Sequence, residues 1–138
     1  MFDRIDSVDS IRLAGRLNSI VEASDGDALS ILVQVNASGE ASKGGFPLAE
    51  TPEAVGQIAQ YPHLVVRGLM TMAPFGADDR TLHGVFGRTR ACLDTCREQI
   101  VGFDASELSM GMSEDFAIAI AEGSTQVRLG TALLGERQ

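Results

Sequence analysis

The chain has 138 residues, of which 44% are hydrophobic and 22% charged, and its formal net charge is −8. This length suits one domain with a single core, and the composition excludes a disordered chain. An acidic chain without a basic run argues against binding to nucleic acid or to an anionic membrane. The apolar runs are far shorter than a membrane span and the N-terminus has no charged-then-apolar signal, which predicts a cytoplasmic protein.

The chain opens with a strand, a helix and a second strand. Residues 4–10 predict a short strand that runs into an N-cap at Asp9 or Ser10. Apolar residues with helical spacing follow over residues 11–21, and "SDGDA" ends that helix. "LSILVQVN" (residues 29–36) is a continuous apolar run rich in β-branched residues, which is typical of a buried parallel strand.

A loop over residues 37–47, rich in glycine and serine, separates this strand from the next helix. Thr51 is predicted to cap that helix, which has Pro52 at its first position and runs to about Gln60. "HLVVRGLM" (residues 63–70) then predicts the third strand, and a further loop follows it.

The last third of the chain repeats the alternation. A long amphipathic helix is predicted from about Thr81 to Gln99, and residues 106–112 ("SELSMGM") predict the fourth strand. Ser113 is expected to cap a short helix whose first turn holds the two acidic residues that follow it. Gly123 ends this helix, and "TQVRLGTALLG" (residues 125–135) contains the fifth strand.

Five strands that alternate with four helices indicate an α/β fold with a parallel sheet, because parallel strands need crossover connections. The pattern is compatible with two arrangements of the sheet, an open doubly wound sheet or part of a (β/α)₈ barrel. In both, ligands bind beyond the carboxyl ends of the strands. The segments expected there are Ser7–Ser10, Asn36–Gly45, Met70–Phe75, Ser109–Ser113 and Arg128–Thr131.

Two of these segments are suited to hold an anion. In Arg128–Thr131, Gly130 lets backbone N–H groups approach a phosphate and Thr131 adds a hydroxyl donor. The alternative is a surface arginine beside a turn glycine. The segment Ser109–Ser113 is also rich in small residues, although its second serine could be only an N-cap and its methionines only core residues. Because both segments end neighbouring strands, we expect them to form one phosphate cradle.

Other reactive side chains have no evident role. Cys92 and Cys96 lack the spacing of redox or metal motifs and are expected to be buried free thiols. His63 and His83 are expected to lack partners. Lys43, the single lysine of the chain, lies in a glycine-rich loop and is expected to be exposed and protonated. We find no Ser-His-Asp or Cys-His order, no paired carboxylates and no metal-binding cluster.

Four segments occur in one order along nearly the whole chain: "IDSVDS", "LVQVNASGEASKGGF", "VRGLMTMAP" and "LSMGMSEDFAIAIAEGSTQVRLGTALLG". Together they resemble the YggS/PROSC family, the pyridoxal 5′-phosphate homeostasis proteins. The resemblance implies a (β/α)₈ barrel like the barrel domain of alanine racemase. It also implies binding of pyridoxal phosphate through a Schiff base without established catalytic turnover, in a protein that holds and hands over the cofactor.

The resemblance implies roles for the residues of the expected cradle. Those implied to contact the cofactor are Ser109, Met110, Ser113, Arg128, Gly130 and Thr131. Arg128 would face the pyridine nitrogen and keep it unprotonated, which makes the ring a poorer electron sink. The others would surround the phosphate. This arrangement would suit a carrier better than an enzyme.

The chain also departs from the family. The family's Schiff-base lysine ends its first strand, whereas this chain begins at what would be the fourth. Lys43 matches a different family lysine, in the loop after the fifth strand, so we expect non-covalent cofactor binding at most. Five strands cannot close a barrel, which predicts one partial-barrel domain over residues 1–138. A second copy or a complementary chain is expected to cover its open edges.

Two alternative functions remain. One is a racemase-type enzyme that acts on amino acids with pyridoxal phosphate. The missing lysine counts against it, as does the position of the single tyrosine, Tyr61, in a turn between a helix and a strand. The other is a structural half-barrel whose role is assembly with a complementary chain.

Overall fold

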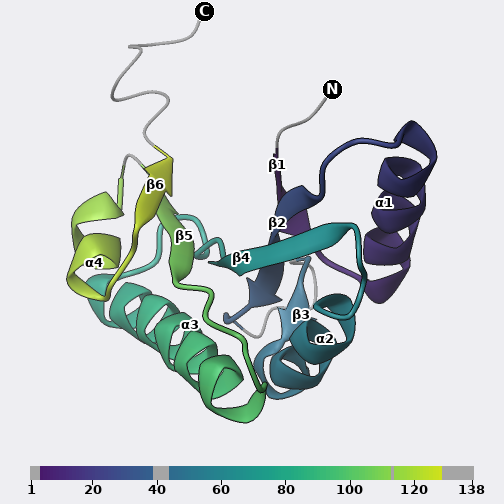
Figure 1. Ribbon diagram of the computed structural model, residues 1–138. Coiled ribbons are helices and arrows are strands. Elements are labelled where there is room, and N and C mark those ends of the chain that lie inside the picture. The colour runs from purple at the N-terminus through teal and green to yellow at the C-terminus, as the bar shows by residue number, and fades with distance from the viewer. Residues whose placement is uncertain (1–3, 39–43, 113, 129–138) are drawn as a thin grey trace, which may run out of the picture.

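The fold is a curved parallel sheet with helices along its outside, seen here in a computed structural model (Figure 1). The structure describes residues 4–38, 44–112 and 114–128. The elements in chain order are β1 (Arg4–Val8), α1 (Ile11–Ser24), β2 (Leu29–Asn36), β3 (Phe46–Pro47), the 3₁₀ turn η1 (Leu48–Glu50), α2 (Thr51–Ile58), β4 (Leu64–Met70), α3 (Asp79–Gln99), β5 (Glu107–Met112), α4 (Phe116–Ala121) and β6 (Gln126–Arg128). None of the helices within these ranges is long and apolar enough to cross a membrane.

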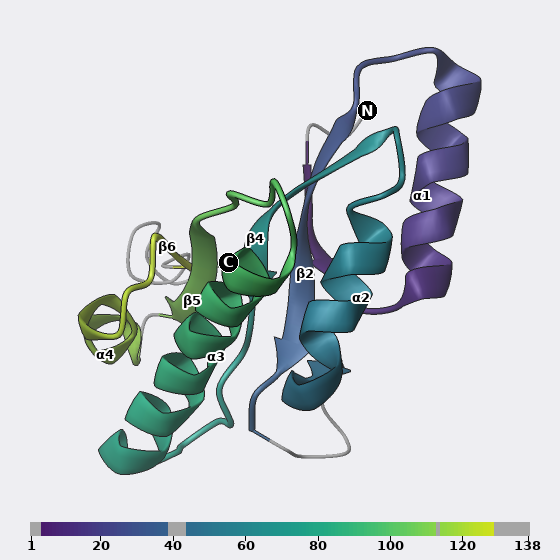
Figure 2. The same cartoon turned by 60° about the horizontal axis from the view of Figure 1, so that its bottom comes forward.

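The strand order distinguishes between the two arrangements of the sheet that are compatible with the sequence. Neighbouring strands follow the order β1-β2-β4-β5-β6, and every pair is parallel. A doubly wound sheet reverses its order and carries helices on both faces. Here the order never reverses, so right-handed crossovers place all the helices on one face. Figure 2 shows α1 to α4 following one another around the outside. The predicted partial (β/α)₈ barrel is confirmed.

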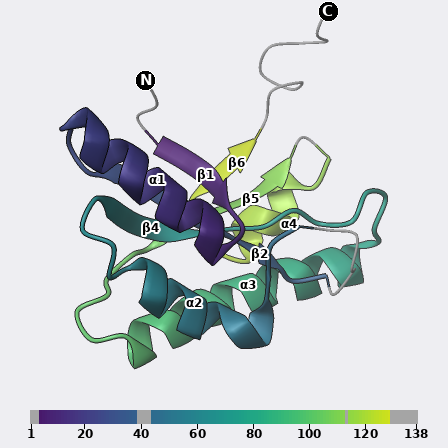
Figure 3. The same ribbon diagram turned by 90° about the vertical axis from the view of Figure 1, so that its right-hand side faces the viewer.

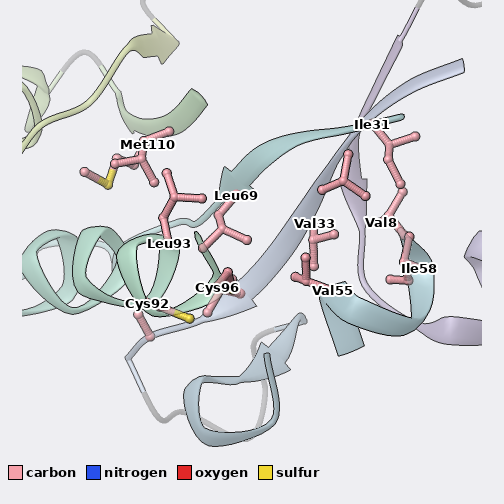
Figure 4. Close-up of a cluster of buried hydrophobic side chains, with 14 of the residues drawn as sticks. Val8, Ile31, Val33, Val55, Ile58, Leu69, Cys92, Leu93, Cys96 and Met110 are labelled. Atoms are coloured by element: carbon pink, nitrogen blue, oxygen red, sulfur yellow. The ribbon is translucent and has the colours of Figure 1, made fainter. Parts of the chain in front are cut away.

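The core lies between the sheet and the helices. Alternate residues of β2, namely Leu29, Ile31, Val33 and Val35, pack into it. Helix α3 contributes the fully buried Val85, Phe86 and Cys96, among others. Figure 4 shows side chains of this cluster between α3, α2 and the strands. Full burial of each large apolar side chain stabilises the fold by roughly 1.5–3 kcal/mol.

Polar side chains fix the starts of two helices. The Oγ of Ser10 accepts the N–H of Leu13 at 3.0 Å, which confirms the predicted cap of α1. Asp78 caps α3 in the same way, because its Oδ1 accepts the N–H of Thr81 at 2.8 Å. Hydrogen bonds from the Thr81 hydroxyl and then from its backbone N–H hold the pKa of Asp78 below its usual value. The long helix therefore begins at Asp79, two residues before the predicted start.

The predicted start of the second helix is wrong. Phe46 and Pro47 form a short strand, β3, beside β2, and the 3₁₀ turn η1 leads directly into α2. Thr51 is thus the first residue of α2 rather than its cap, and its buried hydroxyl donates to the carbonyl of Pro47 at 2.8 Å. The helix ends at Ile58, before the predicted Gln60.

The start of the last helix also differs from the prediction. Helix α4 begins at Phe116 with Asp115 at the N-cap position and no acidic residue in its first turn, whereas Ser113 lies outside the described residues. The carboxylate of Asp115 instead accepts the N–H of Met112 at the end of β5. This side-chain contact back to the strand replaces the predicted cap.

The contact between β4 and β5 predicts a destabilising substitution. Gly68 lies against the backbone of Glu107, and a Cβ added to it would overlap the Glu107 carbonyl oxygen. Since backbone cannot move aside cheaply, we expect Gly68→Ala to lower the free energy of unfolding by at least about 2 kcal/mol. Urea unfolding followed by circular dichroism measures this change.

Gly56 of α2 provides the matched control for this prediction. A Cβ there would meet only Ile100, at 3.9 Å, and alanine is a better helix former than glycine. Gly56→Ala is therefore expected to stabilise the protein by about 0.5–1 kcal/mol. Equal effects of the two substitutions would contradict this account of the β4–β5 contact.

Candidate functional site

The carboxyl ends of the parallel strands lie along one edge of the sheet. The residues that end β1, β2, β4, β5 and β6 are Val8, Asn36, Met70, Met112 and Arg128. All five segments that were predicted to lie near a ligand include or follow these positions. In α/β barrels, ligands bind at this edge of the sheet. The predicted segments therefore lie at the carboxyl edge of the sheet, as expected from the sequence.

Thr71 joins three strands at this edge. Its buried hydroxyl donates to the carbonyl of Val35 in β2 at 2.7 Å. Its backbone N–H donates to the carbonyl of Ser109 in β5 at 3.1 Å. Because these bonds are shielded from water, they hold the ends of β2, β4 and β5 in a fixed relation.

The carboxyl end of β5 packs closely against α4. Gly111 has a φ of 103°, and a Cβ there would stand 2.6 Å from the Cβ of Ala119. Only glycine therefore allows α4 to pack this closely against the strand end. One residue later, the N–H of Met112 donates to Oδ1 of Asp115 at 2.6 Å. The strand end thus directs a backbone donor at a negatively charged group.

Serine and threonine side chains hold β6 against β5. The hydroxyl of Ser124 lies 2.8 Å from the carbonyl of Met110 and 2.7 Å from that of Gln126. The Oγ1 of Thr125 accepts the N–H of Leu108 at 2.8 Å. With these contacts in place, Met112 and Arg128 are partners in the strand register.

The structure separates the predicted cofactor residues into three groups. Ser109 is 2% exposed, and it faces away from the helices because its neighbours along β5 point into the core. The side chain of Met110 belongs to that core. Ser113, Gly130 and Thr131 lie outside the described residues, as does the side chain of Arg128. The lysine of the glycine-rich loop, Lys43, lies outside them too.

The opposite, amino-terminal end of the strands carries an ion-pair network. Arg4 of β1 contacts the carboxylates of Asp6 and Glu107, each at 2.8 Å. Glu107 belongs to β5, three strands away along the sheet. Its contact with Arg4 therefore spans the concave face. Hydrogen bonds to Asp6 and then Glu107 hold the pKa of Arg4 above its usual value.

Both histidines have partners, contrary to the prediction. Nδ1 of His83 in α3 lies 2.6 Å from Oε2 of Glu122, at the end of α4. The backbone N–H of His63 donates to the side chain of Asn18 at 2.8 Å. Both contacts join segments far apart in the chain, so no local signal in the sequence could have revealed them. The first contact joins α3 to the end of α4, and the second joins the residue that precedes β4 to α1.

No cluster of three or more His, Cys, Asp or Glu side chains suited to a metal ion occurs among residues 4–38, 44–112 and 114–128. The two cysteines are free and buried, as predicted. The polar features described at the carboxyl edge include backbone donors, hydroxyl groups, the Asn36 side chain and the Asp115 carboxylate. The donors among these groups can orient a small anionic ligand, whereas the carboxylate repels one.

Comparison with known proteins agrees with this geometry. Residues 5–138 match the model for the alanine racemase N-terminal domain. The chain belongs to this family. It is also 40% identical over 136 residues to the pyridoxal phosphate homeostasis protein of Vibrio alginolyticus, covering 99% of this chain and 57% of that protein. The resemblance to the homeostasis proteins is thus confirmed.

Solved structures give the same result. PipY of Synechococcus elongatus PCC7942, solved with pyridoxal phosphate bound, matches with a TM-score of 0.82 and 34% identity, covering 92% of this chain and 58% of PipY. Alanine racemase of Corynebacterium glutamicum shares the fold, with a TM-score of 0.69 at 21% identity over 92% of this chain and 34% of that one. The chain spans about half the length of the curated relatives it matches.

The role of Thr71 at the carboxyl edge is open to a direct test. Thr71→Val keeps the side-chain shape but leaves the buried carbonyl of Val35 without this donor. We expect the free energy of unfolding to fall by about 1–3 kcal/mol, as for other unsatisfied buried polar groups. Thr95→Val is the control, because Thr95 makes a similar bond to Ala91 on the exposed side of α3. In urea unfolding, the free energy of unfolding of the Thr95→Val variant is expected to change by less than about 0.5 kcal/mol. Equal losses of stability in the two variants would contradict the role assigned to Thr71.

Proposed function

We propose that this chain binds pyridoxal 5′-phosphate without a covalent bond, at the carboxyl ends of β5 and β6, and that it holds the cofactor instead of catalysing a reaction. The observation that carries the proposal is the turn after Gly111, where the Met112 N–H already bonds a carboxylate and lies in register with Arg128. Relatives named pyridoxal phosphate homeostasis proteins, and the PipY structure with pyridoxal phosphate, support the choice of ligand.

The groups present fit a phosphate. The N–H of Met112 donates to the Asp115 carboxylate at 2.6 Å, so this strand end accommodates a negatively charged oxygen, and a bound phosphate would take this donor by displacing that carboxylate. Ser109 brings a buried hydroxyl to the same strand end. In the proposed site, Ser113, Gly130 and Thr131 complete the phosphate contacts. The side chain of Met110 stays in the core, so its part is limited to backbone contact.

Arg128 has a different part in the proposal. We place its guanidinium against the pyridine nitrogen of the cofactor, where a permanent cation disfavours protonation of that nitrogen. Bound pyridoxal phosphate supplies an aldehyde that reacts with amines and a ring that withdraws electrons when protonated. A site that suppresses ring protonation is suited to storage, which favours a homeostasis protein over a racemase-type enzyme.

The proposal predicts reversible binding without attachment. We expect a saturable change in the absorbance of pyridoxal phosphate on addition of the chain, reversed by inorganic phosphate, because the phosphate group supplies most of the contacts. Borohydride reduction followed by peptide mass analysis is expected to leave Lys43 unmodified. A stoichiometric adduct on Lys43 would contradict the non-covalent part of the proposal. A complete lack of saturable binding would contradict the proposal itself.

A substitution at Asp115 tests where the cofactor binds. The Asp115 carboxylate would repel the bound phosphate and compete with it for the Met112 N–H, so Asp115→Asn removes the repulsion and weakens the competing bond. We expect affinity for pyridoxal phosphate to rise roughly three- to tenfold, which corresponds to about 1 kcal/mol between neighbouring charges. Asp94→Asn, on the exposed side of α3, makes the same charge change and is expected to leave affinity unchanged. Equal effects of both variants would indicate a general charge effect.

We also propose that a second copy of this chain, or a complementary chain, covers the open sheet. In the described part of the sheet, β1 and β6 each pair on one side only, and such edges favour association with another chain. The ion pair between Arg4 and Glu107 lines the concave face that a partner would cover.

Light scattering tests this assembly. We expect a mass in solution of at least twice that of one chain, with Arg4→Ala weakening the association because it removes a charged contact from the concave face. A stable, folded monomer would contradict both forms of the proposal.

A further inference from the structure

A groove lies on the outer, helix-covered side of the fold, and one of its walls begins directly after β3, which pairs with the carboxyl end of β2. It has a volume of about 540 Å³ and runs between η1, α2 and α3. Its walls include Leu48 and Pro52 on one side, and Arg88, Cys92 and Thr95 on the other. Figure 3 shows α2 and α3 side by side. This volume falls within the range of small-molecule sites, roughly 300–1,000 Å³.

One of the two cysteines of the chain, Cys92, lines this groove. Cys92 and Cys96 lie four residues apart, on consecutive turns and the same face of α3 (Figure 4). Cys92 lines the groove and is 7% exposed, whereas Cys96 is fully buried in the core. A molecule in the groove can therefore reach only the first of the two sulfurs.

The surroundings of Cys92 favour its ionised form. A hydrogen bond from the Cys96 thiol lowers the pKa of Cys92, and Thr51 lowers it further against the opposing effect of burial. The pKa of Cys96 is raised, first because it keeps its proton to donate to Cys92 and then because it is buried. Contact with Thr51 also places Cys92 beside the N-terminus of α2, where the helix dipole stabilises negative charge.

Thr51 has one hydroxyl proton, which the carbonyl of Pro47 accepts while Cys92 is neutral. The thiol of Cys96 is thus the principal donor to the Cys92 thiolate. Arg88 is one turn before Cys92 on α3 and lines the same groove. Glu53 lines it too, so the groove carries one charge of each sign near the thiol.

We propose that Cys92 is a modification site that exchanges with small disulfides entering this groove. In the reaction, the Cys92 thiolate attacks one sulfur of the small disulfide and forms a new S–S bond, while the original S–S bond breaks. The departing thiolate takes up the proton that Cys92 lost, so the products are a mixed disulfide on Cys92 and one small thiol. The small disulfide is the oxidant, and Cys96 stays reduced. This site does not depend on cofactor binding at the carboxyl edge.

The experiment uses the intact chain and glutathione disulfide near neutral pH. After trapping of free thiols, peptide mass analysis is expected to find one glutathionyl group, on Cys92 and not on Cys96. The Cys96→Ala variant removes the thiol donor, so the pKa of Cys92 rises and its rate of modification near neutral pH falls roughly fivefold. The pH profile of the rate is expected to move to higher pH in that variant.

Several outcomes would overturn this proposal. They are modification of Cys96 in the folded chain, a Cys92–Cys96 disulfide in place of the adduct, and thiols that react only after unfolding. The proposal would also be overturned if the rate of Cys92 modification depended on pH in the same way as that of a cysteine in an unstructured peptide. Thr95→Val, which alters the groove wall without touching the thiol pair, controls for general effects of substitution in α3. Circular dichroism of each variant separates loss of the site from loss of the fold.

Discussion

The close parallel pairing of β4 with β5 is the constraint on which the rest of the structure depends. Gly68 lacks a Cβ, so the backbone of Glu107 can lie directly against it, and this contact sets the register of Leu69 with Leu108 and of Met70 with Ser109. One residue further, the N–H of Thr71 meets the Ser109 carbonyl. Because of this register, the end of β5 lies at the carboxyl edge of the sheet, where the proposed phosphate contacts lie.

Much of the fold could be predicted from the sequence because its signals are local. "LSILVQVN" is apolar throughout, and the structure forms β2 over these same residues because both faces of the strand are largely covered. The N-cap at Ser10 and the long helix that becomes α3 follow from side-chain chemistry and helical periodicity. Periodicity alone could not separate a barrel from a doubly wound sheet, since that depends on strand order. The family resemblance supplied this choice.

The failures have two physical origins, local turns that shift helix starts and contacts between distant segments. Thr51 and Ser113 both have the chemistry of an N-cap, yet a 3₁₀ turn leads directly into α2, and Asp115 occupies the N-cap position of α4. The partner of His83 is 39 residues away, in a different helix. For the candidate site, the sequence located the strand ends but could not show that Met110 points into the core or that an acid meets the Met112 N–H.

The most direct test of the account is an amide NMR titration of the chain with pyridoxal phosphate. If the phosphate binds at the end of β5, the largest shifts fall on Gly111 and Met112, with smaller shifts at Ser109 and Asp115. The amides of α1 and of the groove side of α3 stay unchanged. Shifts centred on α1 or α3, or no saturable shifts at all, would contradict the proposal that the carboxyl edge of this half-barrel holds the cofactor.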